Sequence, residues 1–490
     1  MAFRIWIISV FVLAVLYPAY LNAGPPSRHG AELLSPVAMS GQEIPAVAGG
    51  KVVRRRTASV RLDLLSHLLD DGDEVLGLEL FEDVRLDCIF RRRVGRSSSS
   101  YTFFGEIAGI VGGTFSLAVE DETMIANVRL PSEGLYQIRY VSDGVHEVVE
   151  LDANWIADCN GGMRVPEEDR EPAAMSENIV QAQEQSVTLD DVACGVDILV
   201  VYTPAARDAA GGTTAMQAVI NLAIDESNAA YSNSGIDLRL RLVHTADVNY
   251  TESGSSATDL ERLTYTDGYM DSVQSLRDTY GADLVCLLVD YPSGGSRGWL
   301  WDDPAYYFAD YAFHVVAWDD ATGYYSLAHE AGHNMGCEHA TPESVQGAGL
   351  YSYSMGWRFD SNSYRTIMAY SPGTRIQHFS NPDVTYLGYA TGVPIGMSNE
   401  AHNALSINNA ASTVANWRTH TVAYPILAGD FEGDCDVDWV DLGLLCSQWL
   451  NTDCDADNDF CGGADFEGDG DVDIDDFARF AENWGQGLMH

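Results

Sequence analysis

A short stretch of sequence decides the fold of this chain: His329-Glu330-Ala331-Gly332-His333-Asn334-Met335-Gly336-Cys337-Glu338-His339. On a helix, His329 and His333 lie one turn apart on the same face, so both imidazoles can reach a single metal ion. Gly336 has no Cβ and can adopt the left-handed conformation that ends a helix, which lets His339 fold back as a third ligand. The spacing therefore predicts one zinc ion with an open fourth position, as in catalytic sites.

The carboxylate of Glu330 directly follows the first expected ligand. At this position it can act as general base on a water molecule that zinc activates. The alternative is a chance coincidence of histidines and a glycine on an amphipathic helix. That alternative would require five matching identities at fixed positions, so we favour hydrolysis assisted by zinc.

A second motif follows the histidines, Arg365-Thr366-Ile367-Met368-Ala369-Tyr370-Ser371. We expect Met368 to pack beneath the three histidines as an apolar floor, which is the arrangement called a Met-turn. With both motifs, residues 194–418 resemble a metzincin peptidase, most closely the reprolysin (adamalysin) branch and its bacterial relatives. Asn334-Met335-Gly336 and Phe379-Ser380-Asn381-Pro382 support that resemblance. It implies an α/β zincin domain with a twisted mixed sheet, a zinc-bearing active-site helix and hydrolysis of peptide bonds.

Tyr370 departs from the reprolysin pattern, because it lies two residues after the methionine, as in the astacin and serralysin branches. In those branches such a tyrosine binds zinc or stabilises the tetrahedral intermediate. Two interpretations therefore stay open, a catalytic hydrogen-bond donor and a plain buried aromatic residue. We expect the protein or peptide substrate to lie extended along an edge strand at 298–301.

The first residues have the layout of a secretory signal, expected at 1–23. Arg4 supplies a positive charge, 5–16 an apolar core and Leu21-Asn22-Ala23 a cleavage site. We expect a secreted, extracellular or cell-surface protein; the alternative is an uncleaved membrane anchor. No later stretch is long enough to span a membrane.

Composition adds two constraints. The formal net charge of −45 argues against nucleic acid as a partner, because phosphate would be repelled. Nine cysteines are an odd number, so at least one must be free, metal-bound or paired between chains. We expect two disulfides among the clustered Cys435, Cys446, Cys454 and Cys461.

The organisation along the chain is multidomain. Residues 24–190 resemble a β-rich propeptide, irregular to about residue 60, with strands up to about Asp152 and an exposed polar linker at 160–190. Residues 191–420 form the expected catalytic domain. There the periodicity predicts strands at 196–202, 236–248, 283–289, 298–301 and 313–317, a helix at 214–232, helical material up to Tyr280 and the histidine helix from about Tyr324.

A cysteine in the propeptide could keep the enzyme latent as a zymogen. Cys159 could place a thiolate, a strong zinc ligand, at the open metal position. Cys88 lies in an alternating pattern and is expected to be buried. A disulfide from Cys159 to Cys194 is the rival interpretation.

Near the carboxyl end, Asp430-Phe431-Glu432-Gly433-Asp434-Cys435-Asp436-Val437-Asp438 recurs as Asp465-Phe466-Glu467-Gly468-Asp469-Gly470-Asp471-Val472-Asp473. An apolar stripe at helical spacing follows each copy, so residues 428–487 resemble a dockerin, a small all-α pair of EF-hand type. The repeat predicts two calcium ions. The expected side-chain ligands are Asp430, Glu432, Asp434, Asp438 and Asp441, then Asp465, Glu467, Asp469, Asp473 and Asp476, with backbone carbonyls of Asp436 and Asp471.

Three departures from the dockerin pattern put a cohesin-like partner in doubt. A glutamate stands at the second ligand position, Cys435 replaces a glycine, and Trp439-Val440 and Ile474-Asp475 replace the usual Ser-Thr pair. A cell-surface docking partner remains the other expectation.

The sequence thus favours a secreted zinc endopeptidase, made as a zymogen and tethered through a calcium-dependent module. One alternative is an assembly or docking protein with a catalytically inert zincin-like domain. A zinc hydrolase of non-peptide bonds is the other. The intact His329, Glu330, His333 and His339 favour the peptidase.

Overall fold

A computed structural model describes most of residues 31–484. The residues outside the description within that range are 37–43, 46–50, 66–67, 69–74, 132–133, 153–154, 156–160, 173–194, 292–294, 423–427, 432–436, 438 and 456–457. The signal expected at 1–23 and the candidate Cys159 therefore lie outside the described residues. None of the helices in the described part of the chain is both long and apolar enough to cross a membrane.

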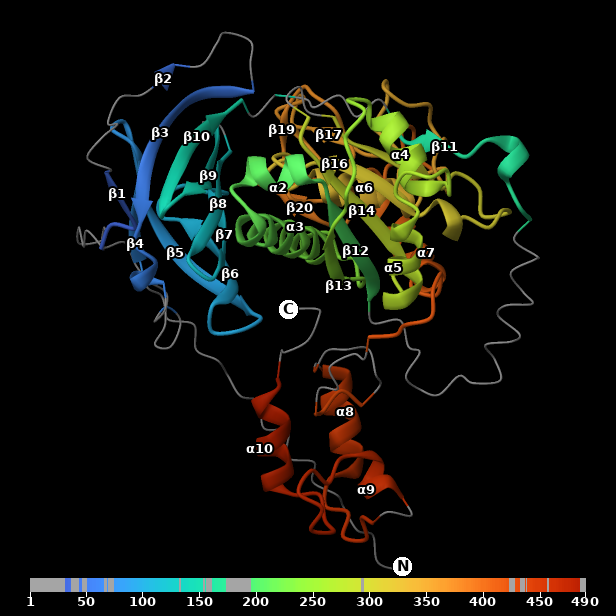
Figure 1. The fold of residues 1–490 in the computed structure, drawn as a ribbon. Helices are drawn as coiled ribbons and strands as arrows, with labels where there is room; N and C mark the ends of the chain where they lie inside the picture. The colour runs from blue at the N-terminus through green and yellow to red at the C-terminus, as the bar shows by residue number, and fades with distance from the viewer. Residues whose placement is uncertain are drawn as a thin grey trace, which may run out of the picture.

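The amino-terminal part forms a large antiparallel sheet, curved in Figure 1, in the order β1-β3-β10-β9-β8-β7-β6-β5-β4. The chain turns between β9 and β10 at Ser142-Asp143-Gly144, with positive φ at Asp143 and Gly144. The expectation of irregular chain up to residue 60 is wrong for Val52–Val60, which pairs with Val145–Leu151. The strands are β1 Leu34–Pro36, β2 Ile44–Pro45, β3 Val52–Val60, β4 Val75–Phe81, β5 Val84–Gly95, β6 Ser100–Ile107, β7 Thr114–Glu120, β8 Thr123–Leu130, β9 Gly134–Ser142 and β10 Val145–Leu151.

A second sheet is mixed, as expected, and has the order β11-β15-β16-β14-β12-β13. Every residue of β12, β14 and β16 is buried, which is typical of parallel strands covered on both faces. β15 runs antiparallel to β16, and β11 adds to its other side in parallel. These strands are β11 Met163–Arg164, β12 Val196–Tyr202, β13 Leu240–Asp247, β14 Leu284–Val289, β15 Arg297–Leu300 and β16 Phe313–Ala317.

The long helix α3 (Thr213–Asn233) lies between the two sheets in Figure 1. It contacts β7 and β8 on one side and the histidine helix α6 (Ser326–Asn334) on the other. Ala118 and Ile125 of the first sheet join the hydrophobic core of the second. The remaining elements of this region are α2 Pro204–Ala210, α4 Ser256–Thr264, α5 Ser272–Tyr280, β17 Arg358–Phe359, β18 Tyr364–Arg365, β19 Thr374–Arg375, β20 Thr385–Tyr386, β21 Tyr389–Ala390 and α7 Asn403–Val414.

The carboxy-terminal repeat places one helix after each loop, α8 (Trp439–Gln448) and α10 (Ile474–Glu482), with α9 (Asp459–Gly462) between them. Cys454 and Cys461 form a disulfide. The expectation of a second bridge is wrong for Cys446, which is an exposed free thiol. The reason is helical: Leu445 is buried, and the next residue on a helix points about 100° away from it.

A cluster of charged side chains joins the residues that follow α7 to the strands β12 and β13 of the mixed sheet. Asp197 on β12 accepts two hydrogen bonds from Arg241, at 2.6 and 2.7 Å, and its Oδ2 lies 2.8 Å from Nδ1 of His420. Asp283 accepts hydrogen bonds from the backbone N–H groups of Asp197 and Arg418. The hydrogen bond to Asp197 raises the pKa of His420, and burial raises the pKa of Asp283 to about 7.

Both shifts predict that stability falls as the pH rises. A raised histidine pKa stabilises the fold fully below its unfolded pKa of about 6.5, and this stabilisation is lost as the pH passes the folded value. The carboxyl of Asp283, whose pKa is raised in the folded state, likewise stabilises the fold less as the pH rises towards 7. We expect the thermal midpoint to fall by roughly 2 °C between pH 6 and pH 8.5, and His420→Gln to flatten that slope. Parallel slopes for wild type and His420→Gln would contradict the assignment.

Candidate metal centre and active site

Helix α6 presents the first two histidines and then stops abruptly. Gly336 has a φ of 86°, and a Cβ there would come within 2.4 Å of the Leu350 Cβ. The N–H of Cys337 donates to the Gly332 carbonyl at 2.8 Å as the chain turns back. The glycine therefore fulfils its predicted role and returns His339 to the helix face.

The three histidines converge through one nitrogen each. The Nε2 atom of His339 lies 3.1 Å from Nε2 of His329 and 3.0 Å from Nε2 of His333, and all three side chains are buried. Tetrahedral zinc with Zn–N bonds of about 2.0–2.1 Å would hold its nitrogens roughly 3.3 Å apart. The spacing of the Nε2 atoms therefore fits one zinc ion.

Their other ring nitrogens are fixed by the protein. Nδ1 of His329 donates to the carbonyl of Ile367, and Nδ1 of His333 to that of Cys337, both at 2.8 Å. Glu338 Oε1 accepts the N–H of His339 at 2.7 Å and lies 3.3 Å from its Nδ1. Burial lowers the pKa of His333 to about 4 and holds the pKa values of His329 and His339 well below their usual range. All three rings are thus neutral at pH 7, the form that binds metal.

Met368 lies under α6, where the Met-turn interpretation expects it. Its Sδ is 2.8 Å from the position that a Cβ on Gly332 would take, so the helix rests directly on the thioether. Met368 is fully buried, and its neighbour Ile367 supplies the carbonyl bound by His329.

Glu330 is buried and lies against the edge of the sheet. A Cβ on Gly298 of β15 would come 2.9 Å from the Glu330 carbonyl oxygen and 3.4 Å from its Oε2. The carboxylate is therefore next to the strand on which we expected substrate to lie.

Two residues that sequence reasoning gave no role tie α6 to the sheet. Asn334 donates from its Nδ2 to the carbonyls of Trp299 and Phe313, at 2.8 and 3.1 Å. Its Oδ1 accepts from Nδ1 of His314 at 2.8 Å, and burial lowers the pKa of that imidazole to about 4. The N–H of Trp301 also donates to the His333 carbonyl at 3.1 Å. These hydrogen bonds therefore hold α6 against β15.

Tyr370 stands beside the third histidine. Its ring centroid is 4.1 Å from that of His339, and its hydroxyl accepts the N–H of Gly161 at 3.2 Å. The side chain is only partly buried. This position agrees better with a hydrogen-bonding role than with a plain core residue.

Three arginines act electrostatically on the histidines, and no sequence motif had indicated this. The positive charge of Arg375 lowers the pKa values of both His329 and His339, in addition to burial. Arg358 has the same effect on His339, and Arg297 on His333. Arg358 is itself paired with Glu343, and Glu338 Oε1 lies 3.3 Å from Nδ1 of His339, so both signs of charge are present at the centre.

The segment 161–172 runs across this centre. Met163 pairs with Trp299 and Arg164 with Leu300, in parallel. A Cβ on Gly162 would come 2.9 Å from Nδ1 of His333, so the chain passes directly over a metal-binding residue. Glu167, Glu168, Asp169, Glu171 and Pro172 are exposed, as expected of a linker, but the expectation is wrong for Val165, which is buried. The pairing of Met163 and Arg164 was also not expected, because the catalytic domain supplies a strand edge and charged partners that local sequence does not show.

The carboxy-terminal loops are described unequally. Glu432, Asp434, Asp436 and Asp438 lie outside the described residues. One contact recurs in both copies at 2.7 Å: Asp441 accepts the N–H of Phe431, and Asp476 accepts that of Phe466. In the second loop one carboxylate oxygen each of Glu467, Asp473 and Asp475 lies within 4.8 Å of the others, and Asp475 was not among the predicted ligands. Of the predicted ligands there, Asp465 accepts the N–H groups of Asp469 and Gly470, and Asp471 is partly exposed.

In the amino-terminal sheet, Cys88 is buried in β5 as a free thiol, as expected. Burial raises the pKa of that thiol. Cys194, the rival partner for Cys159, lies outside the described residues, as does Cys435.

Three neutral imidazoles that share one metal position, with a carboxylate next to the first, define a zinc-dependent hydrolase. The sequence model of metallo-peptidase family M12 matches residues 194–380. The chain is 31% identical to a peptidyl-Asp metalloendopeptidase of Xanthomonas campestris, over 76% of this chain and 87% of that one. It is 35% identical to a protein of the same name from Stenotrophomonas maltophilia, over 63% of this chain and 71% of the relative. This chain belongs to metallo-peptidase family M12 and is a metalloendopeptidase.

Proposed function

We propose that this chain is an exported zinc endopeptidase, made as a zymogen, that cleaves peptide bonds next to aspartyl residues. The observation that carries the proposal is the convergence of three Nε2 atoms within 3.0–3.1 Å beside the buried Glu330. His329, His333 and His339 would hold the zinc ion.

The proposed mechanism assigns proton transfer to Glu330. Bound zinc supplies polarisation of the scissile carbonyl and lowers the pKa of water. Glu330 accepts a proton from the attacking water as the new C–O bond forms, and passes it to the nitrogen as the C–N bond breaks. Tyr370 donates a hydrogen bond to the developing oxyanion once Gly161 no longer occupies its hydroxyl. Met368 supports the histidines from below.

Selectivity for aspartate is supported by charge. The two relatives carry peptidyl-Asp in their names. In this chain Arg297, Arg358 and Arg375 act electrostatically on the histidines. A carboxylate of the substrate would be attracted to these arginines, whereas the acidic residues that dominate the chain would repel it.

Latency is supported by the position of residues 161–172 on β15, which is the strand that an extended substrate would use. We propose that residues 24–190 act as the propeptide, that the signal at 1–23 directs export, and that Cys159 adds a thiolate ligand to zinc. The zymogen would become active after cleavage between the propeptide and residue 195.

For the carboxy-terminal module, residues 428–487, we propose a dockerin-like unit that binds two calcium ions and tethers the enzyme to a cohesin-like or cell-surface partner. The repeated contacts of Asp441 and Asp476 support two equivalent loops. The alternative, an assembly protein with an inert zincin-like domain, is disfavoured by the intact histidines.

Metal removal tests the enzymatic proposal. Treating the activated enzyme with 1,10-phenanthroline should lower the cleavage rate of a denatured protein by at least about 100-fold, and added zinc should restore it. A calcium-selective chelator should leave this rate unchanged while lowering the thermal midpoint of the carboxy-terminal module. Cleavage that survives complete removal of zinc would refute the proposal.

A further inference from the structure

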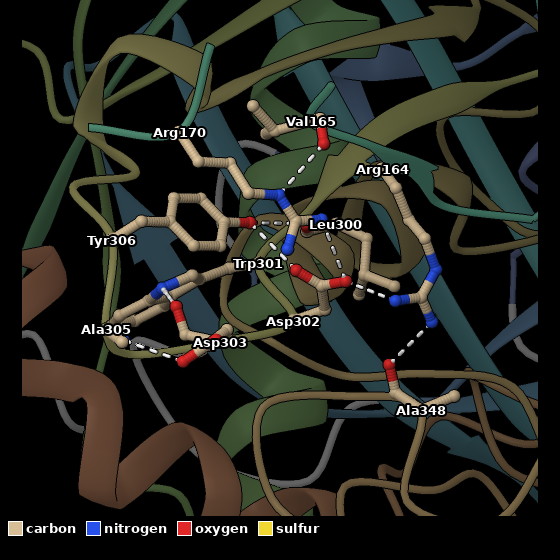
Figure 2. Close-up of polar contacts among 10 residues, drawn as sticks. All are labelled: Arg164, Val165, Arg170, Leu300, Trp301, Asp302, Asp303, Ala305, Tyr306 and Ala348. Carbon is tan, nitrogen blue, oxygen red and sulfur yellow. Dashed lines mark hydrogen bonds and ion pairs between the residues drawn. The ribbon is translucent and has the colours of Figure 1, made fainter. Parts of the chain in front are cut away.

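A buried carboxylate stands two residues beyond β15, at Asp302. Its side chain is 5% exposed and makes ion pairs with both Arg164 and Arg170. The Tyr306 hydroxyl donates to its Oδ1 at 3.0 Å, so both carboxylate oxygens are engaged (Figure 2). Burial raises the pKa of Tyr306, which therefore remains a donor at neutral pH.

The walls of this site belong to the catalytic domain. The carbonyl of Ala348 accepts a hydrogen bond from Nη2 of Arg164 at 3.1 Å, on the side opposite Asp302. The ring of Tyr306 lies 4.8 Å from the guanidinium of Arg170, within the range of a cation–π contact. Asp302, Tyr306 and Ala348 thus form a receptor for a guanidinium group.

The loop that carries Asp302 is itself held in place. The side chain of Asp303 accepts the N–H of Ala305 at 2.8 Å, and its carbonyl accepts Nε1 of Trp301 at 3.1 Å (Figure 2). The N–H of Trp301 donates to the His333 carbonyl. The receptor is therefore fixed relative to the histidines by backbone contacts that do not involve residues 161–172.

The register of β11 sets the distance from the reacting centre. Gly162 lies over His333, and Arg164, two residues further along, pairs with Leu300 and reaches Asp302. Any extended chain added to β15 keeps the spacing of about 3.3 Å per residue. A side chain a few residues from the scissile bond would therefore face Asp302.

We propose that Asp302, with Tyr306 and the Ala348 carbonyl, is a substrate subsite that selects an arginine or lysine side chain, and that Arg164 occupies it in the latent chain. The inference rests on the proposed function and deepens it. When residues 161–172 leave, Asp302 loses both cationic partners, and the Tyr306 hydroxyl is the contact that the catalytic domain itself supplies to its carboxylate. A substrate cation restores the pair. The preferred substrate then has an acidic residue at the scissile bond and a basic residue a few positions away.

The test uses activated wild-type enzyme and a set of peptides with a fixed aspartate. At each of the four positions on either side of the scissile bond, arginine, lysine, glutamine or glutamate is placed in turn, and kcat/KM is measured. We expect one position at which arginine and lysine exceed glutamine about tenfold, with glutamate the poorest. That position also reveals the direction in which substrate lies on β15.

Variants of the enzyme localise the effect. Asp302→Asn should reduce the ratio of arginine to glutamine peptides to about one, whereas the control Asp237→Asn, at an exposed position between α3 and β13, should keep the wild-type ratio. The ratio of kcat/KM for arginine and glutamine peptides is compared within each variant, and the thermal midpoint of each variant confirms that it is folded. Equal rates for arginine and glutamine at every position in wild type would overturn the inference, as would a ratio that survives in Asp302→Asn. If no peptide is cleaved in a zinc-dependent manner, the proposed function fails first, and the subsite falls with it.

Discussion

Replacing Glu330 with glutamine should lower kcat/KM of the activated enzyme by about 10²–10⁴-fold, the range that a general base contributes. Glutamine has nearly the same shape but cannot accept the proton of the attacking water. The carboxylate is buried beside Gly298, so the side chain has little room for a compensating position. Hydrolysis of a fluorogenic peptide that contains one aspartate measures the effect.

The zinc content separates loss of chemistry from loss of the metal. Because His329, His333 and His339 are held by other contacts, Glu330→Gln should keep one zinc ion per chain. Glu261→Gln, an exposed position on α4, serves as the matched control and should retain wild-type rates. Substantial activity in zinc-loaded Glu330→Gln would remove this residue from the mechanism.

Replacing Glu226 with glutamine should weaken the latency that we propose. This buried carboxylate on α3 accepts four hydrogen bonds: from Ser116 at 2.5 Å and Asn127 at 2.8 Å in the first sheet, and from Thr322 at 2.7 Å and the Gly323 N–H at 2.8 Å. Burial raises its pKa, and the four donors oppose that shift. A carboxamide would turn an NH₂ group towards two of the donors.

The hydroxyls of Ser116 and Thr322 can turn and accept from that NH₂ group, but the N–H groups of Asn127 and Gly323 cannot. Leaving one of these buried donors without an acceptor should weaken the association of the first sheet by roughly 2 kcal/mol, or about 30-fold. Under the proposed latency the full-length wild-type chain is nearly silent, so the full-length variant should cleave the fluorogenic peptide measurably faster, and its first sheet should become sensitive to trypsin. Glu261→Gln is again the control. An unchanged full-length rate, with an unchanged thermal midpoint, would show that Glu226 does not hold the propeptide.

The sequence predicted what depends on local periodicity. The strands β12, β14 and β16 and the helix α3 were expected within one residue of their bounds, because their apolar runs or helical periods are continuous. The His329-to-His339 spacing also sufficed to place three nitrogens together, since a helix and one glycine fix that geometry.

The sequence missed what depends on distant partners. Burial partly alternates along β3, but the consecutive charged residues Arg54, Arg55 and Arg56 mask that alternation in the sequence, so the strand was not predicted. The pairing of Met163 and Arg164 with β15 involves two residues and carries no local signal. Arg375 acts on the histidines from a two-residue strand, and its place depends on the path of the chain after Met368.

The position of residues 161–172 on β15 has a kinetic consequence. Because this segment belongs to the same chain as the strand it covers, their contact forms at an effective concentration of order millimolar, whatever the dilution of the protein. A weak intrinsic affinity of the segment for β15 is then enough to keep that strand covered. Once the chain is cut between residue 172 and β12, the same segment becomes a bimolecular competitor whose occupancy falls on dilution. Under the proposed export and latency, dilution into a large volume would thus complete an activation that proteolysis begins.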